Sequence, residues 1–262
     1  MKKIILDIQR KAGLKNTKII RQLSQDVLGN RWLINTDKGE MVLSFKSELA
    51  NRISLDISHQ FDLLKFISKS GIAPEPFFLD IQNRVLLVNY IDGKNIHAFQ
   101  LKQNEMLEEI ANLFFQLHSI DSPTFLPYIT IEKKLELYSS QVKNMKIDTI
   151  LSRVKRLISG YSGGTQVICH NDVHRGNIIV GKKIAFIDWD YAGIGNLWFD
   201  LAAFIEQEKF SMKSRDYFLD AYFGSRASWS KEQLDDWLKI YQLVEKIWQY
   251  CIAAFNQRKS ND

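Results

Sequence analysis

The chain has 262 residues, a length that fits one large domain or two modest lobes. Its 45% hydrophobic and 25% charged residues are typical of a globular protein and exclude a disordered or collagen-like chain. The net charge of +5 is spread along the chain, which suits a polyphosphate ligand but does not by itself indicate nucleic acid.

The first part of the chain is predicted to form a β-rich lobe with one helix. Short β-prone runs predict strands at residues 17–23, 31–35, 41–46, 77–79 and 85–90. Thr36-Asp37-Lys38-Gly39 is typical of a hairpin turn between the second and third of these strands. The helix is predicted over residues 52–69, with one apolar face and with Gly71 at its end. That face would carry Leu55, His59, Leu63 and Ile67.

The second part is predicted to be mainly helical with one embedded β-hairpin. From about Gln103 the apolar period is 3.6, and the stripe consists of Met106, Ile110, Leu113, Phe114 and Leu117. Further helices are predicted at residues 131–145, 147–159 and 232–255, and strands at residues 167–169, 178–180 and 184–187. The sequence therefore predicts an α+β fold with an N-lobe of residues 1–92 and a C-lobe of residues 93–262. The lobes would join near residues 89–93.

The chain also carries signals about its compartment. Its two cysteines, Cys169 and Cys251, allow at most one bridge, and the N-terminus has no signal-peptide pattern. No window approaches the roughly 20 unbroken apolar residues that span a bilayer. A cytoplasmic protein without a membrane partner is therefore predicted.

The most informative stretch is the polar loop, defined as residues 170–177. Asp172 and Asn177 lie near its two ends, and Asp188 ends the adjacent strand of the hairpin. Because neighbouring strands lie about 4.8 Å apart, Asn177 and Asp188 are expected to converge on one cation. Oxygen ligands without thiolates favour Mg²⁺ over zinc. Asp172, which the metal does not need, would accept a proton from a substrate hydroxyl.

Two other interpretations of the polar loop compete with this one. His170 and His174 could bind zinc, but they lack an obvious third ligand. A hydrogen-bonded turn without chemistry would use Asn, Asp and Gly in the same way. The coupled segment around Asp188 weighs against a plain turn.

These residues resemble a known signature. His170-Asn171-Asp172-Val173-His174-Arg175-Gly176-Asn177 with Ile187-Asp188-Trp189-Asp190-Tyr191-Ala192-Gly193 is similar to the signature of the aminoglycoside phosphotransferase and choline kinase superfamily, relatives of protein kinases. The thiamine kinase and bacterial choline kinase branch resembles it most. The signature fills roughly residues 167–205, with weaker similarity over residues 23–90. The resemblance implies a protein-kinase-like two-lobed fold.

The resemblance also implies residue roles. Asp172 would be the catalytic base, and Asn177 and Asp188 would bind the metal. His170, His174 and Asp200 would support the loop, although Asp200 alone is typical of a helix N-cap.

For the nucleotide, the resemblance points to a hairpin at residues 23–30. Ser24, Gly29 and Asn30 fit the family pattern, whereas Gln25 and Asp26 stand where small glycines are usual. The backbone at Asn89, Tyr90 and Ile91 would bind adenine.

A basic residue on the third strand is also expected by resemblance. Ser44 stands at the position where relatives usually carry this basic residue, and Lys46 lies two residues later on the same strand face. Lys46 is therefore the candidate for pairing with the phosphates, against a plain solvent-facing lysine. The helix acid that anchors such a lysine in relatives appears here as Gln60.

The acceptor is expected to be a cationic alcohol. Asp190, Trp189 and Trp248 are the candidate acceptor-binding residues, since aromatic faces and carboxylates attract cations. Core packing is the competing interpretation for Trp237, Tyr241 and Trp248, which fall at helical spacing. An aminoglycoside would instead need several carboxylates, which Glu206, Glu208, Asp235 and Asp236 could supply.

The predicted function is therefore transfer of the ATP γ-phosphoryl group to a thiamine-, choline- or ethanolamine-type alcohol, with ATP and Mg²⁺ as cofactors. The alternatives are an aminoglycoside phosphotransferase and a catalytically silent nucleotide-binding module. A protein kinase is disfavoured because Trp189-Asp190 replaces Phe-Gly after Asp188. The expected partner is a small-molecule alcohol and not nucleic acid, and the protein would be a monomer or dimer.

Overall fold

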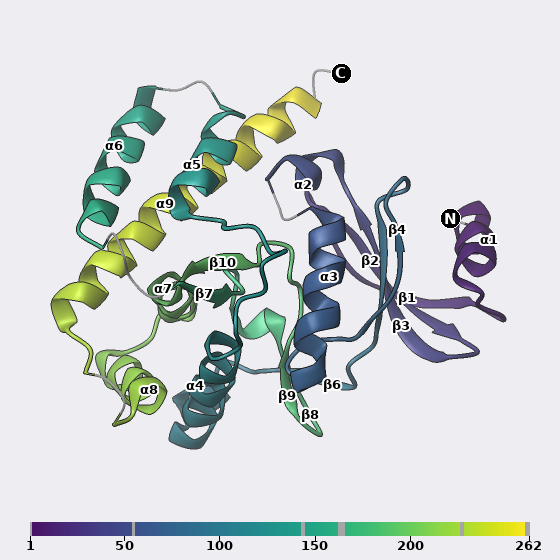
Figure 1. Cartoon of the computed structure of the whole chain (residues 1–262), viewed down its shortest axis with the longest axis horizontal. Coiled ribbons are helices and arrows are strands. Elements are labelled where there is room, and N and C mark those ends of the chain that lie inside the picture. The colour runs from purple at the N-terminus through teal and green to yellow at the C-terminus, as the bar shows by residue number, and fades with distance from the viewer. Residues whose placement is uncertain (1, 54–55, 143–144, 162–165, 226–227, 260–262) are drawn as a thin grey trace. The chain divides into compact units, whose positions relative to one another are not determined.

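The computed structural model describes residues 2–53, 56–142, 145–161, 166–225 and 228–259. The chain divides into two compact units, Met1–Asp92 and Gly93–Asp262 (Figure 1).

The first unit is built on a five-stranded antiparallel sheet in the order β1-β2-β3-β5-β4. Its strands are β1 (Lys18–Asp26), β2 (Gly29–Thr36), β3 (Gly39–Lys46), β4 (Pro76–Asp80) and β5 (Val85–Asn89). Each predicted strand overlaps one of these, and the β2–β3 hairpin turns where it was predicted, with Thr36 paired to Gly39. The Thr36 side chain accepts from the Lys38 N–H group at 3.0 Å and stabilises that turn.

The prediction of a single helix in this unit is wrong. The structure has α1 (Lys2–Ala12), α2 (Glu48–Ile53) and α3 (Ile57–Ile67). The predicted helix at residues 52–69 splits because the Asp56 side chain caps a new helix, accepting from the Ser58 N–H group at 2.8 Å. Gly71, at φ 79°, follows the short 3-10 turn Ser68–Ser70 and ends the helical segment as predicted. The predicted apolar-face residue Leu55 lies outside the described residues.

Helix α1 was not predicted, because its apolar residues are few and interrupted. Ile5 and Ile8 on this helix join Leu14 in one buried cluster with residues of the sheet. Lys11 near its end pairs with Asp80 of β4 at 2.6 Å. The helix therefore covers part of the sheet (Figure 1).

The second unit is mainly helical. Its helices are α4 (Asn104–His118), α5 (Ile131–Ser139), α6 (Met145–Ser159), α7 (Leu197–Gln207), α8 (Met212–Phe223) and α9 (Lys231–Lys259). Its strands are β6 (Gly93–Asn95), β7 (Gln166–Cys169), β8 (Ile178–Gly181), β9 (Ile184–Phe186) and β10 (Gly193–Asn196). They form a three-stranded sheet, β6-β8-β9, and a two-stranded sheet, β10-β7. The predicted hairpin is β8–β9, whereas β6 and β10 were not predicted.

Helix α5 ends at Ser139, earlier than the predicted residue 145. The hydroxyl groups of Ser139 and Ser140 donate to the carbonyls of Glu136 and Leu137, three residues back. Such local bonds let serine compete with a continuing helix.

An aromatic cluster forms the centre of the second unit. The Phe114 ring of α4 lies 5.2 Å from Phe186, 5.5 Å from Phe204 and 5.7 Å from Phe218, measured between centroids. These rings come from β9, α7 and α8, and all are buried. The cluster therefore fixes the end of β9 and the start of the segment that carries Asp188.

In the described part of the chain, no helix is both long and apolar enough to cross a membrane.

Candidate active site

The polar loop follows β7 and is held at its start by Asp200. The Asp200 carboxylate accepts the backbone N–H groups of His170, at 2.7 Å, and of Asn171. Asn171 has φ 66°, in the left-handed region that asparagine tolerates, and its side chain donates to the Tyr191 carbonyl at 2.9 Å. The loop therefore leaves β7 in a defined direction.

Asp200 is itself part of a buried chain of hydrogen bonds. It lies on α7 and is fully buried, and His118 Nε2 of α4 lies 3.2 Å from its Oδ2 atom. The Tyr222 hydroxyl of α8 lies 2.7 Å from the other ring nitrogen of His118. Burial would raise the pKa of Asp200, but the bonds from His118 and the loop hold that pKa below its ordinary value. The N-cap of α7 is Asn196, so the interpretation of Asp200 as a helix cap is wrong.

His118, Cys169 and Asp200 form a buried group whose atoms could in principle hold a metal ion. Both nitrogens of His118 and both oxygens of Asp200 already have hydrogen-bond partners. Burial also raises the pKa of the Cys169 thiol well above its ordinary value, which disfavours the thiolate that a metal needs. This group therefore braces the loop.

Asp172 and Asn177 lie side by side in the polar loop. The Asn177 amide nitrogen donates to the Asp172 carbonyl at 2.9 Å and lies 3.3 Å from the Asp172 Oδ2 atom. The amide nitrogen of Gln207, at the end of α7, lies 3.5 Å from Asp172 Oδ1. Because the nitrogen of Asn177 faces Asp172, its amide oxygen is the atom that can ligate a cation.

Asp188 lies beside Asn177 through the backbone. The Ile187 N–H group donates to the Asn177 carbonyl at 2.9 Å, and Asp188 follows with φ 68°. A non-glycine residue in this left-handed region indicates that the surrounding structure fixes the turn. Asp188 and Asn177 thus offer a carboxylate and an amide oxygen on adjoining chain segments, a donor set that fits Mg²⁺.

His170 links the two segments. It is fully buried, and its Nε2 atom lies 3.0 Å from the Ile187 carbonyl, which can only accept. The proton must therefore be on Nε2, and Nδ1 has no hydrogen-bond partner within the described residues. Burial lowers the pKa of His170 to about 4, so the ring is neutral. A buried, neutral ring of this kind suits a structural role, holding the two segments together, better than proton transfer.

Contacts of His174, Glu208 and Asn95 fix the far end of the polar loop. His174 Nδ1 accepts the Gly176 N–H group at 3.0 Å. Glu208 accepts the backbone N–H group of Arg175 at 2.7 Å and its guanidinium at 3.1 Å. The Asn95 side chain of β6 donates to the Gly176 carbonyl at 2.6 Å. His174 was predicted from sequence as a support of the loop, but the contacts of Asn95, Arg175 and Glu208 were not, because these contacts join residues 33 to 81 positions apart.

The predicted acceptor residues have different surroundings. Trp189 is 1% exposed, and its ring lies 4.6 Å from that of His170 and donates to the Phe186 carbonyl. This placement favours packing over contact with a ligand. Asp190 is also buried, whereas Trp248 is half-buried and donates to the Tyr191 hydroxyl at 3.0 Å.

Core packing is the role of two α9 aromatics. Trp237 is 1% exposed and its ring lies 5.5 Å from that of Tyr161. Tyr241 is buried and its ring lies 5.6 Å from that of Phe199. The helical spacing had favoured this packing.

Tyrosines gather near Asp172. Burial raises the pKa values of Tyr138, Tyr191 and Tyr241, and the Asp172 carboxylate raises each of them further. Tyr138 lies one turn beyond Lys134 on α5, and neither residue was predicted to belong to the site. Their spacing of four residues placed them on one helical face, a signal that sequence reasoning did not use.

In the first unit, the hairpin between β1 and β2 is closed by Asp26. Its carboxylate accepts the N–H groups of Leu28 at 2.7 Å and Gly29 at 3.0 Å. At Gly29 a Cβ atom would come within 2.0 Å of the Phe45 carbonyl oxygen, so only glycine fits. Ser24 accepts from Arg31 at 3.3 Å. The Asp26 carboxylate thus accepts the hydrogen bonds of two backbone N–H groups that would be free to bind phosphate in a glycine-rich turn.

The other predicted nucleotide residues are also in this unit. Lys46 is 7% exposed, so the alternative of a solvent-facing lysine is wrong. Asn30 accepts from Gln22 at 3.3 Å. The backbone N–H groups of Asn89 and Tyr90 donate to the backbone carbonyls of Glu75 and Glu40. Adenine contacts there would therefore use the carbonyls of Asn89 and Tyr90 or the backbone of Ile91.

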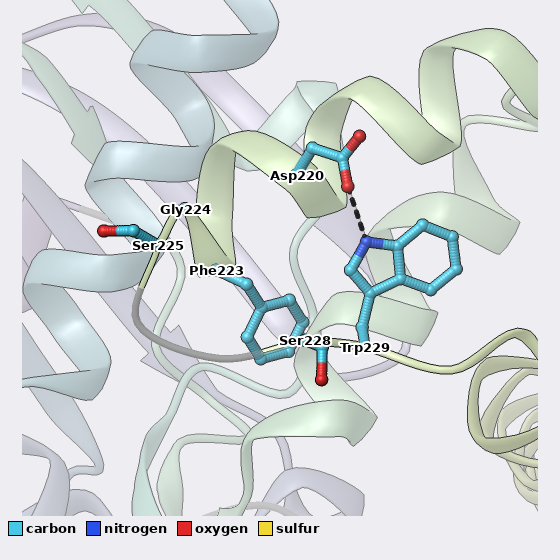
Figure 2. Close-up of a pocket in the computed structure, with 6 residues that line it drawn as sticks. All are labelled: Asp220, Phe223, Gly224, Ser225, Ser228 and Trp229. Carbon is cyan, nitrogen blue, oxygen red and sulfur yellow. Dashed lines mark hydrogen bonds between the residues drawn. The ribbon is translucent and has the colours of Figure 1, made fainter.

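A cavity of about 590 Å³ lies elsewhere in the second unit, at the end of α8 (Figure 2). Its walls include Asp220, whose carboxylate accepts from the Trp229 indole at 2.8 Å, and Phe223. No residue of the polar loop lines it. The cavity does not combine a base with metal ligands among its lining residues, so it is not the candidate active site.

The comparisons agree with the fold and the signature. The model of the phosphotransferase enzyme family matches residues 19–237. Protein LicA of Haemophilus influenzae is 23% identical over 197 residues, which cover 68% of this chain and 72% of that protein. Thiamine kinase of Escherichia coli is 32% identical over 137 residues, 50% of this chain and 46% of that protein.

Among solved structures, choline kinase LicA from Streptococcus pneumoniae has a TM-score of 0.80 and 17% identity. The match covers 100% of this chain and 92% of that one. At this identity the likeness concerns the fold. The predicted α+β, protein-kinase-like two-lobed fold and the predicted family resemblance are both confirmed.

Proposed function

The chain belongs to the phosphotransferase enzyme family, and we propose that, as a kinase of small-molecule alcohols, it transfers the γ-phosphoryl group of ATP to the hydroxyl of a cationic alcohol. Thiamine, choline and ethanolamine represent the acceptor class. The LicA proteins and thiamine kinase among its relatives support this class.

The observation that carries the proposal is the arrangement of Asp172 and Asn177. The amide nitrogen of Asn177 is directed to Asp172 and its oxygen away from it. One side chain therefore positions the base and offers a ligand atom for a cation. Asp188, on the adjoining segment, supplies the carboxylate that would complete this pair of ligands.

Each residue then has a defined task. Asp172 accepts the proton of the acceptor hydroxyl and orients its oxygen for in-line attack. Asn177 and Asp188 would hold Mg²⁺, which neutralises phosphate charge when bound. Asp200 and His170 keep the polar loop and the Asp188 segment in register. Buried Lys46 is the proposed phosphate contact in the first unit, with Ser24, Asn30 and the backbone at Asn89, Tyr90 and Ile91 as further nucleotide contacts.

For the acceptor, the half-buried Trp248 and Tyr191 offer aromatic faces that suit a cation. Buried Asp190 adds negative charge. Three of the four acids that would favour an aminoglycoside already accept hydrogen bonds from other residues of the chain. Glu208 binds Arg175, Glu206 accepts from Gln242, and Asp236 accepts from Tyr161. This argues for the smaller acceptor.

The test is ADP release from purified protein with Mg²⁺ and ATP across thiamine, choline, ethanolamine and several aminoglycosides. Turnover that depends on one cationic alcohol is expected. Turnover with aminoglycosides alone would show that the acceptor is an aminoglycoside and not a small cationic alcohol. ATP binding without turnover on any acceptor would favour the silent nucleotide-binding module.

A further inference from the structure

Lys134 is a buried lysine that the proposed reaction does not use. The residue is 4% exposed, and its ammonium lies 4.7 Å above the centre of the Phe199 ring. Within the described residues, no carboxylate lies within ion-pair distance of this ammonium. The contact with an aromatic face replaces only part of the hydration free energy that a charged group loses when it is buried.

The charged groups that face Lys134 come from the elements around the polar loop. Asp200 of α7, Cys169 of β7 and Asp172 of the polar loop all act on its ammonium. Asp200 is already bonded by His118 and two backbone N–H groups, and the Cys169 thiol is neutral. On α5 itself, Tyr138 lies one turn away, and α9 contributes Tyr241 beside Phe199. Both tyrosines are neutral at ordinary pH.

The acceptor must come close to the same ammonium. Its hydroxyl has to reach Asp172, and in a small cationic alcohol the positive charge lies a few bonds from the hydroxyl. The charge is therefore brought into the neighbourhood of Lys134, inside a partly dry site. Two like charges roughly 10 Å apart at an effective dielectric constant of about 20 repel enough to change an affinity about tenfold.

We propose that Lys134 sets the charge preference of the acceptor site, because its buried ammonium weakens the binding of a permanently cationic alcohol. The inference rests on the proposed function and adds a specificity-determining residue to it. When Lys134 is neutral, the cationic acceptor binds more tightly, whereas the affinity for an uncharged acceptor of the same shape does not change.

The lysine can change its charge in the range where enzymes are assayed. Burial lowers the pKa of Lys134 to about 8, although Asp200, Cys169 and Asp172 oppose this shift. Binding of a cationic acceptor should therefore strengthen as the pH rises through about 8.

The experiment compares choline with 3,3-dimethylbutan-1-ol, in which carbon replaces the charged nitrogen. Each alcohol is measured by its KM if it is phosphorylated, and otherwise by its inhibition constant against the best acceptor. In Lys134→Met at pH 7, the constant for choline should fall about tenfold and that for the uncharged alcohol should not change. Lys133→Met is the matched control, since Lys133 is exposed and its charge is screened by water.

A second measurement keeps the inference testable if Lys134→Met does not fold. In the wild type, the choline constant should fall between pH 7 and pH 9 while the constant for the uncharged alcohol stays level. Equal responses of the two alcohols, in the variant or across pH, would overturn the inference. A wild type that phosphorylates no cationic alcohol would remove the proposed function and this inference with it, whereas turnover that is indifferent to Lys134 would remove the inference alone.

Discussion

Asp172 lies between two side-chain amides, those of Asn177 and Gln207. Both amides direct a nitrogen to the carboxylate and so orient it, which suits a group that must accept a proton and then release it. The two flanking amides therefore fix the orientation of the proposed base.

Asp172→Ala should lower kcat by several orders of magnitude, about 10³-fold or more, because the hydroxyl loses both its base and its orienting partner. The dissociation constant for ATP should change little. Steady-state kinetics and calorimetric titration check the two expectations. Glu206→Gln, a change of charge on neighbouring α7 outside the loop, is the control. A kcat within a few fold of the wild type would take Asp172 out of the chemistry.

Asp188→Ala should abolish the Mg²⁺ dependence of nucleotide binding, since the carboxylate is the charged member of the proposed ligand pair. The measurement is ATP affinity with Mg²⁺ and with EDTA. An unchanged difference between the two conditions would discard the ligand assignment.

Lys134 also makes a prediction about stability. Its pKa is about 8 in the folded chain and 10.5 as the ordinary value, so folding disfavours the charged form. Burying the charged ammonium lowers the free energy of unfolding. This destabilisation is fully present below about pH 8 and disappears as the pH rises toward 10.5, so the wild type becomes more stable as the pH rises through this range.

Lys134→Met should therefore be more stable than the wild type at pH 7 by up to about 3 kcal/mol, and this difference should vanish near pH 10.5. Urea unfolding of both proteins from pH 7 to pH 10.5 measures it. A constant difference across this range would mean that the lysine is not buried in its charged form.

The polar loop is positioned by side chains of three helices, α4, α7 and α8, and only the first of these helices was predicted from sequence by its residues. Tyr222 of α8, His118 of α4 and Asp200 of α7 form one hydrogen-bonded chain that ends on the loop backbone. Since these residues are 82 to 104 positions apart, no local pattern could have joined them. Only the family resemblance pointed to Asp200.

Asp200→Asn should lower kcat about 10- to 100-fold and destabilise the fold by about 2 kcal/mol, because an amide cannot accept from both backbone N–H groups and His118 with the strength of a carboxylate. The dissociation constant for ATP should stay near the wild-type value. Kinetics and denaturant unfolding report both effects. Tyr222→Phe removes the outermost bond of the chain and should lose less in both measurements, and a larger loss there would contradict this order.

Some elements of the fold follow from sequence patterns and others do not. The strands of the first sheet were predictable because their β-prone runs are separated by clear turn residues such as Asp37 and Gly39. Helix α3 was merged with α2 because the apolar spacing ran on through the break that the Asp56 cap creates. The strand β10 is Gly193-Ile194-Gly195-Asn196, whose glycines hide its pairing with β7.

For the whole molecule, the residues of the proposed reaction are divided between the two units. The proposed nucleotide contacts lie in Met1–Asp92, and the base, metal ligands and acceptor residues lie in Gly93–Asp262. The loop motif brought Asp172 and Asn177 together in the sequence analysis because they are five residues apart, and the structure places them in contact. The surroundings of Lys134 and Tyr138 were not predictable, since they depend on how α5 packs against distant segments.

The most direct test of the central claim is to measure the phosphorylated alcohol itself, by mass spectrometry, alongside ADP. The wild type and Asp172→Ala would be incubated with Mg²⁺, ATP and the acceptor selected by the panel. We expect one phosphate ester for each ADP in the wild type and a loss of both products in the variant. ADP without ester, or undiminished ester from Asp172→Ala, would contradict it.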